Sequence, residues 1–147
     1  MIMRKRFKGA LASAGLLMAM GAVPAAAAQG DVSGNGDLSP DRSSAQLTIA
    51  ALCDAPVNVG DTKTGTLTVH LFQPSGRLLN IGIGTAPVTC DGVEANVAVD
   101  VNAIPGLRFK PGPATVVLKL AKQTADSNAA ITESSTTESG GRVTLRP

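Results

Sequence analysis

The feature that most constrains the fold is a two-residue alternation of apolar and polar side chains that recurs along the chain. Successive side chains of a strand point to opposite faces of a sheet, so this period predicts strands with one buried face. Six or seven short strands are expected, and no helical period is visible after residue 28. The positions predicted to face the core are Leu47, Ile49, Ala51, Cys53, Leu67, Val69, Leu71, Leu79, Ile81, Ile83, Val93, Ala95, Val97, Val99, Val101, Val116, Leu118, Leu120, Val143 and Leu145.

Turn residues separate these segments. Asp91-Gly92 stands between two alternating runs, and this dipeptide favours a type I′ hairpin because both central positions need positive φ. Pro74-Ser75-Gly76 is typical of a tight hairpin, and Pro111-Gly112 of a type II turn. Closely spaced strands with such turns predict an all-β fold, an antiparallel immunoglobulin-like β-sandwich of six or seven strands.

The first 28 residues have the order of a secretory signal peptide. Four basic residues lie within the first eight, a run of small apolar residues follows from Ala10 to Val23, and Ala26-Ala27-Ala28 offers a cleavage site. Cleavage would leave a mature chain that starts at Gln29. Neither a cysteine at the cleavage site nor an apolar C-terminal tail is present, so we expect a secreted protein with no membrane anchor, at most loosely associated with the cell wall.

Removal of the signal peptide changes the charge balance. The whole chain has 13 basic and 11 acidic residues, and four of the basic ones lie in the signal peptide, so the mature chain has 9 and 11 and a net charge of −2. Binding to nucleic acid needs clustered Lys and Arg, and the remaining nine form no run. Nucleic acid is therefore excluded as an expected partner.

Two cysteines remain in the mature chain, Cys53 and Cys90. An oxidising compartment permits a disulfide, and two cysteines can pair in only one way. Their wide separation differs from the C-x-x-C spacing of redox-active pairs. A structural disulfide between them is predicted.

Two polar segments flank the predicted strands. Residues 29–44 are rich in Gly and polar residues and are expected to form a flexible linker, which leaves 45–147 as the single sandwich domain. Within that domain, 124–141 is rich in Ser and Thr and is expected to be a mobile loop, or to carry one irregular strand.

Several short stretches resemble a known family. They are Leu47-Thr48-Ile49 leading to Cys53, then Thr89-Cys90-Asp91-Gly92, Phe109-Lys110-Pro111-Gly112-Pro113-Ala114 and Arg142-Val143-Thr144-Leu145. Together they resemble small secreted two-cysteine β-sandwich proteins of unknown function from high-GC Gram-positive bacteria. The resemblance implies secretion and a two-cysteine sandwich, and it supplies no catalytic residues.

Residues that carry chemistry are few. The single histidine, His70, is in phase with Thr66 and Thr68 on the outward face of its strand, and no nucleophile motif such as Gly-x-Ser-x-Gly is present. Phe72 shares that outward phase, and an exposed ring beside a titratable group is common at interfaces. We expect no enzyme activity and no cofactor, and we assign His70 and Phe72 to a possible interaction face.

One stretch partly matches a calcium-binding loop. Asp31, Ser33, Asn35 and Asp37 alternate in the manner of EF-hand ligands, and Gly36 stands at the turn position. The twelfth position, however, is Arg42 instead of a carboxylate, and no helices flank the loop. We therefore interpret the stretch as linker and predict no metal.

These observations predict a secreted, non-enzymatic β-sandwich that acts as an extracellular interaction or cell-envelope-associated module. The expected partner is an extracellular protein or a cell-wall component. The alternative is a secreted inhibitor or small-molecule-binding module that acts through its loops or through one sheet face.

Overall fold

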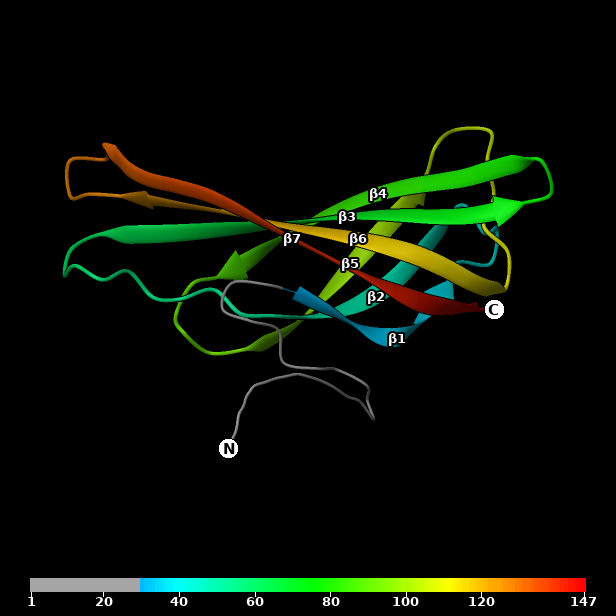
Figure 1. Ribbon diagram of the computed structural model, residues 1–147, viewed down its shortest axis with the longest axis horizontal. Helices are drawn as coiled ribbons and strands as arrows, with labels where there is room; N and C mark the ends of the chain where they lie inside the picture. The colour runs from blue at the N-terminus through cyan, green and yellow to red at the C-terminus, as the bar shows by residue number, and fades with distance from the viewer. Residues whose placement is uncertain (1–29) are drawn as a thin grey trace, which may run out of the picture.

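A computed structural model describes residues 30–147, so the predicted signal peptide, 1–28, lies outside the described residues. The described chain is all-β, as predicted (Figure 1). Its seven strands are β1 Gly30–Leu38, β2 Ser44–Ala51, β3 Thr62–Ser75, β4 Leu78–Thr89, β5 Ala95–Ala103, β6 Gly112–Ala125 and β7 Ile131–Arg146.

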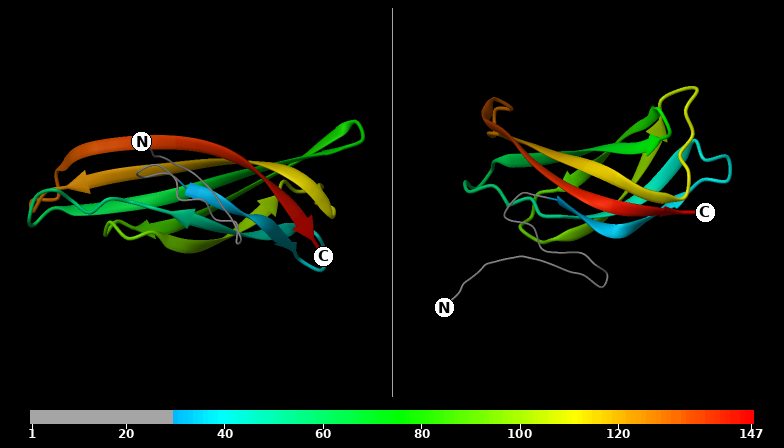
Figure 2. Two further views of the ribbon diagram at one scale, coloured as in Figure 1. Left: turned by 60° about the horizontal axis from the view of Figure 1, so that its bottom comes forward. Right: turned by 45° about the vertical axis from the view of Figure 1, so that its right-hand side comes forward.

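The strands form a closed barrel in the order β1-β2-β5-β4-β3-β6-β7, and the predicted open sandwich is wrong. Two short seams close the sheet. β1 and β7 run parallel and pair over three positions, Asn35–Asp37 with Thr144–Arg146, and β4 and β5 pair only through Gly82 with Ala103 and Ile83 with Asn102. The longer ladders, such as β3 with β4 and β6 with β7, form the rest of the wall (Figure 2).

Most of the predicted core positions face the interior. Leu47, Leu67, Val101 and Leu145 are buried, and Phe109 from the β5–β6 loop joins them. The prediction for β4 has the opposite phase: Ile83 points outward and is 49% exposed, while Gly82 and Gly84 face inward. Val93, also predicted to face the core, lies in the β4–β5 connection and is exposed.

Close packing explains the phase of β4. A Cβ added at Gly82 would lie 2.6 Å from Cζ of Phe109, and one added at Gly84 would collide with the backbone carbonyl of Asp100. Only glycine permits this approach, so the inward positions of β4 carry no side chain where β4 meets β5. Ile81 and Ile83 then occupy the outward positions.

Two segments predicted as irregular form strands. The expected linker 29–44 contains β1, which pairs with β2 and β7, and the expected loop 124–141 contains the end of β6, a turn at 126–130 and most of β7. Both strands are rich in polar residues, so they lack the apolar alternation that indicates a strand. The first eight residues of β7 lack buried side chains, and the pairing with β6 holds that part of the strand in place.

The predicted disulfide is confirmed. Cys53 and Cys90 are bonded, with their Cα atoms 4.4 Å apart, and both are buried in the core. The Asp91-Gly92 dipeptide does not form a two-residue hairpin, since five residues, 90–94, connect β4 to β5. The N–H of Gly92 donates instead to the carbonyl of Cys53, 2.9 Å away, so the disulfide and this hydrogen bond tie the connection to the end of β2.

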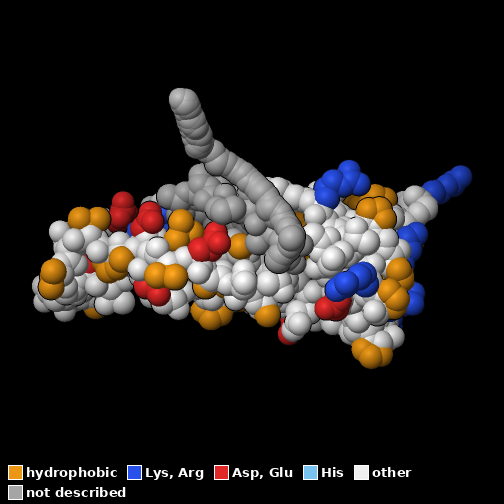
Figure 3. Space-filling model, turned by 90° about the horizontal axis from the view of Figure 1, so that it is seen from below, with side chains coloured by type: hydrophobic (Ala, Val, Ile, Leu, Met, Phe, Trp, Pro, Cys, Tyr) orange, Lys and Arg blue, Asp and Glu red, His pale blue; other side chains and the backbone are white. Residues whose placement is uncertain are grey.

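Charged side chains are divided unequally between the two ends of the elongated barrel. Figure 3 shows most of the visible Lys and Arg at the end that carries the β3–β4 turn, and most of the visible Asp and Glu toward the opposite end. We call the first the basic end, which also carries the β1–β2 and β5–β6 connections, and the second the acidic end, which carries the β2–β3, β4–β5 and β6–β7 connections.

Candidate interaction face and groove

The predicted interaction residues project outward from the middle of β3. Thr66, Thr68, His70 and Phe72 alternate with the buried Leu67, Val69 and Leu71, as the sequence predicts. The rings of His70 and Phe72 stack, with centroids 6.4 Å apart and an angle of 11° between planes. Both side chains are half-buried.

Neighbouring strands surround this stack with apolar side chains. Ile83 of β4 and Val117 of β6 lie opposite His70 in the two ladders, and Ile81 lies opposite Phe72. Residues opposite one another in antiparallel strands have Cβ atoms about 5 Å apart, close enough for side-chain contact. The two positions directly beside His70 thus carry no carboxylate, which a catalytic triad would need.

A loop residue extends this surface. Ile104 follows β5 directly, its N–H donates to the carbonyl of Ile81 over 2.9 Å, and its side chain is 46% exposed. We use the name β3–β4 face for the outward surface made by His70, Phe72, Ile81, Ile83 and Ile104. Large apolar side chains are uncommon in groups on the outside of a sheet that faces water, so this face is a candidate contact surface.

The β3–β4 face is not covered by the Ser/Thr-rich segment. Most of that segment, 124–141, continues the sheet as β7, which pairs along β6. Because β6 separates β7 from β3, the segment extends the wall on one side of the stack and does not fold over it.

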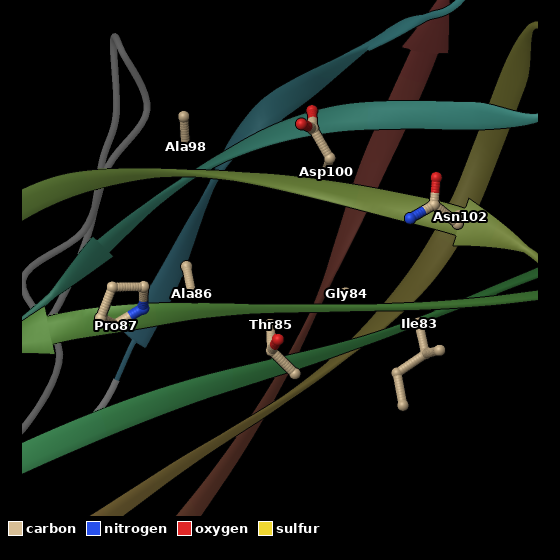
Figure 4. A pocket seen from close by; sticks show the side chains of 8 residues that line it. All are labelled: Ile83, Gly84, Thr85, Ala86, Pro87, Ala98, Asp100 and Asn102. Atoms are coloured by element: carbon tan, nitrogen blue, oxygen red, sulfur yellow. The ribbon is translucent and has the colours of Figure 1, made fainter.

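A groove adjoins this face along the short seam between β4 and β5. The two strands are joined at Ile83 and Asn102 and diverge toward Pro87 and Ala98 (Figure 4). The groove between them has a volume of about 600 Å³, within the usual range for small-ligand sites. Its eight lining residues are Ile83, Gly84, Thr85, Ala86, Pro87, Ala98, Asp100 and Asn102.

Polar groups in the groove are few and point in different directions. Ile83 and Thr85 project from β4 away from the side chains of Asp100 and Asn102 on β5 (Figure 4). The carboxylate of Asp100 accepts a hydrogen bond from the amide of Gln46 over 3.3 Å. One carboxylate held by a neutral amide offers contacts to a ligand and lacks the paired acid and base of hydrolytic sites.

The candidate calcium ligands lie on β1 instead of a loop. Asn35 and Asp37 pair with β7, and Asp37 accepts a salt bridge from Arg146 at 3.0 Å. Asp31 and Ser33 belong to the same strand. No cluster of three or more metal-ligating side chains occurs among the described residues.

The β1–β2 turn contains Asp41, a carboxylate whose pKa is clearly lowered. The main-chain N–H of Ser43 and the hydroxyls of Ser43 and Ser39 all donate to Oδ1 of Asp41, over 3.0, 2.8 and 2.8 Å. These hydrogen bonds lower the pKa of Asp41 to about 2. The network shapes the turn, in which Arg42 adopts a positive φ of 62°.

Sequence reasoning located His70 and Phe72 on an outward face, but it missed Ile81 and Ile83 as their neighbours and missed the groove. One signal was present: Gly82 and Gly84 occupy alternate positions of a strand, which is typical of a close approach by another backbone.

Comparison with models of protein families finds no match, and comparison with curated protein sequences finds no significant similarity. The resemblance to small secreted two-cysteine proteins therefore stays a prediction. Within residues 30–147, no helix is long and apolar enough to cross a membrane. The disulfide is typical of proteins that fold in an oxidising, extracellular environment.

Proposed function

We propose that the protein is a secreted, non-enzymatic module that binds an extracellular protein or a cell-wall component through the β3–β4 face. The observation that carries this proposal is the apolar surface around the stacked His70 and Phe72, on the outside of a wall whose inside already has its own core. Interface centres favour aromatic rings within a patch from which water can be excluded.

The surrounding chemistry supports contact in preference to catalysis. The ladder neighbours of His70 are Ile83 and Val117, which can bury apolar area against a partner and cannot transfer protons. Thr68, the outward residue of β3 next to His70, borders the patch with its hydroxyl group. An apolar centre with a polar rim is the usual organisation of a protein interface.

The test uses the double variant Phe72→Ala, Ile83→Ala against the wild-type protein. Each protein is immobilised and exposed to culture medium and to solubilised cell wall of the producing organism, and retained material is identified by mass spectrometry. We expect a component that the wild type retains and the double variant loses. Thr66→Ala, on the same side of β3 but outside the face, is the matched control and should retain it.

Unfolding in denaturant separates an interface from a buried core. Both side chains keep part of their surface in water, so their truncation should lower the free energy of unfolding by less than the roughly 3 to 5 kcal/mol of a fully buried Phe→Ala change. Equal retention by the wild type and the double variant would rule out this face as the binding surface.

The groove favours a second candidate, a small-molecule-binding or inhibitor module. Thr85, Asp100 and Asn102 offer polar contacts beside apolar walls in a space that a small ligand could fill. Ala98→Phe would fill part of the groove and leave the β3–β4 face unchanged. A ligand that raises the melting temperature of the wild type, but not of Ala98→Phe, would support this alternative over the first.

A further inference from the structure

The two ends of the barrel carry opposite side-chain charge. At the basic end lie five exposed cations and two carboxylates, a net charge of +3: Arg42, Arg77, Arg108, Lys110 and Arg146 against Asp37 and Asp41. At the acidic end lie six carboxylates and two lysines, a net charge of −4: Asp54, Asp61, Asp91, Glu94, Asp126 and Glu133 against Lys63 and Lys122.

Within one molecule these two groups are too far apart to attract each other. β3 spans the barrel with 14 residues, which at about 3.3 Å per residue gives roughly 46 Å. The Debye length at physiological ionic strength is about 8 Å, so the field of one end is screened before it reaches the other. Each end therefore presents its charge to the solvent and to other molecules.

Exposed apolar side chains gather at the same two ends. Of the eight large apolar side chains that are exposed in the described residues, Ile83 and Ile104 belong to the β3–β4 face and the other six lie at the ends. At the acidic end Val57 and Val59 are 95% and 105% exposed, and Val93 and Ile131 accompany them. At the basic end Leu78 is 66% exposed, beside Leu79. Apolar residues surrounded by charge are a common composition for an interface.

We propose that the protein associates head to tail, with the basic end of one copy docked on the acidic end of the next. A second copy is the partner that these observations favour, because one chain presents both complementary surfaces. The two surfaces differ, so the contact is heterologous and leaves a free end on each side of every dimer. Such a contact forms open chains of copies whose length increases with protein concentration.

Salt provides the first test. Single exposed ion pairs contribute little, so the attraction comes from several charges acting together with the apolar contacts, and salt weakens the charge contribution. In sedimentation velocity experiments on the protein as the producing cell makes it, the average mass should rise with concentration in dilute buffer. It should return toward the monomer at about 0.5 M salt.

Charge reversal at each end provides the decisive test. The acidic-end variant is Asp54→Lys, Glu94→Lys and the basic-end variant is Arg77→Glu, Arg108→Glu; all four side chains are exposed. Each variant alone should be monomeric, because the substitutions bring the acidic end to a net charge of about 0 or the basic end to about −1, and the attraction is then lost at every contact. A mixture of the two variants should form dimers, because the unchanged basic end of one variant can bind the unchanged acidic end of the other. These dimers should grow no further, because their two free ends are the substituted ones.

The matched control reverses charge in the middle of the barrel. Lys119→Glu, Glu138→Lys exchanges two residues that lie opposite each other in β6 and β7 and should assemble like the wild type. The proposal is overturned if the wild type stays monomeric in dilute buffer, if either end variant still assembles alone, or if their mixture stays monomeric. Because the β3–β4 face is unchanged in these variants, failure here leaves the proposed function untouched.

Discussion

The Cys53–Cys90 disulfide lies just outside the strands, so its contribution to stability can be removed without disturbing one. It closes a loop of 37 residues between the end of β2 and the end of β4. In the chain-entropy model, a loop of this length stabilises the folded state by about 4 kcal/mol, because the cross-link restricts the unfolded chain. The expected entropy of unfolding for roughly 118 residues is about 250 cal/mol/K, so losing the cross-link should lower the melting temperature by about 16 °C.

Two samples separate the cross-link from the packing of its sulfur atoms. Wild-type protein treated with a reductant keeps both sulfurs and loses only the bond, whereas Cys53→Ala, Cys90→Ala loses both, and both sites are buried. Calorimetry on the two samples should give similar decreases in melting temperature, with a slightly larger one for the double variant because of the small cavities it creates. A decrease of less than about 4 °C in the reduced wild type would refute the entropic reasoning. Alkylation of two free thiols in native protein would refute the bond itself.

Three further outcomes are expected. Gly84→Ala places a methyl group against the carbonyl of Asp100 and should lower the free energy of unfolding by about 1 to 3 kcal/mol. Gly140 has space for a Cβ, so Gly140→Ala should lower it by less than about 1 kcal/mol. Equal effects in denaturant unfolding would contradict the close approach at Gly84. The buried side-chain amide of Gln73 donates to the carbonyl of Lys110 over 2.7 Å and accepts from its N–H over 2.9 Å. Gln73→Leu should therefore lower the free energy of unfolding by about 2 to 4 kcal/mol. An unchanged free energy of unfolding would argue against these hydrogen bonds. The pKa of Asp41 is lowered to about 2 in the folded state, so ionised Asp41 stabilises the fold fully above about pH 4, and this stabilisation is lost as the pH falls through about 2. An NMR titration of Asp41 with a midpoint near 3.8 would contradict the hydrogen bonds of its turn.

The fold was predictable in the strands that have apolar side chains at every second position. β2, β3 and β6 bury the residues that the alternation assigns to the core, and the cysteine count predicts the disulfide. The alternation in β4 predicted the wrong phase, because Gly82 and Gly84 occupy inward positions and the large side chains of Ile81 and Ile83 face outward. β1 and the first half of β7 were not predicted, because they are held in the sheet by hydrogen bonds to neighbouring strands. Main-chain hydrogen bonds between strands leave no pattern in the amino-acid sequence.

The difference between a sandwich and a barrel depends on a few hydrogen-bonded pairs. Two residue pairs join β4 to β5, and three join β1 to β7. Both architectures bury the same side chains in the same alternation, so the sequence pattern does not distinguish them. For the candidate site, the phase of β3 sufficed to place His70 and Phe72 together, whereas the groove depends on how far β4 and β5 diverge and has no counterpart in the linear sequence.

The parallel seam between β1 and β7 also affects when the protein can finish folding. Asn35 pairs with Thr144, and the salt bridge between Asp37 and Arg146 joins residues 109 positions apart. Contacts of such long range make folding slow, typically milliseconds to seconds, because the whole intervening chain must be ordered first. The barrel cannot close until its last strand has been synthesised. A chain built in this way stays open while it is being made, which would suit the secretion that we propose for this protein.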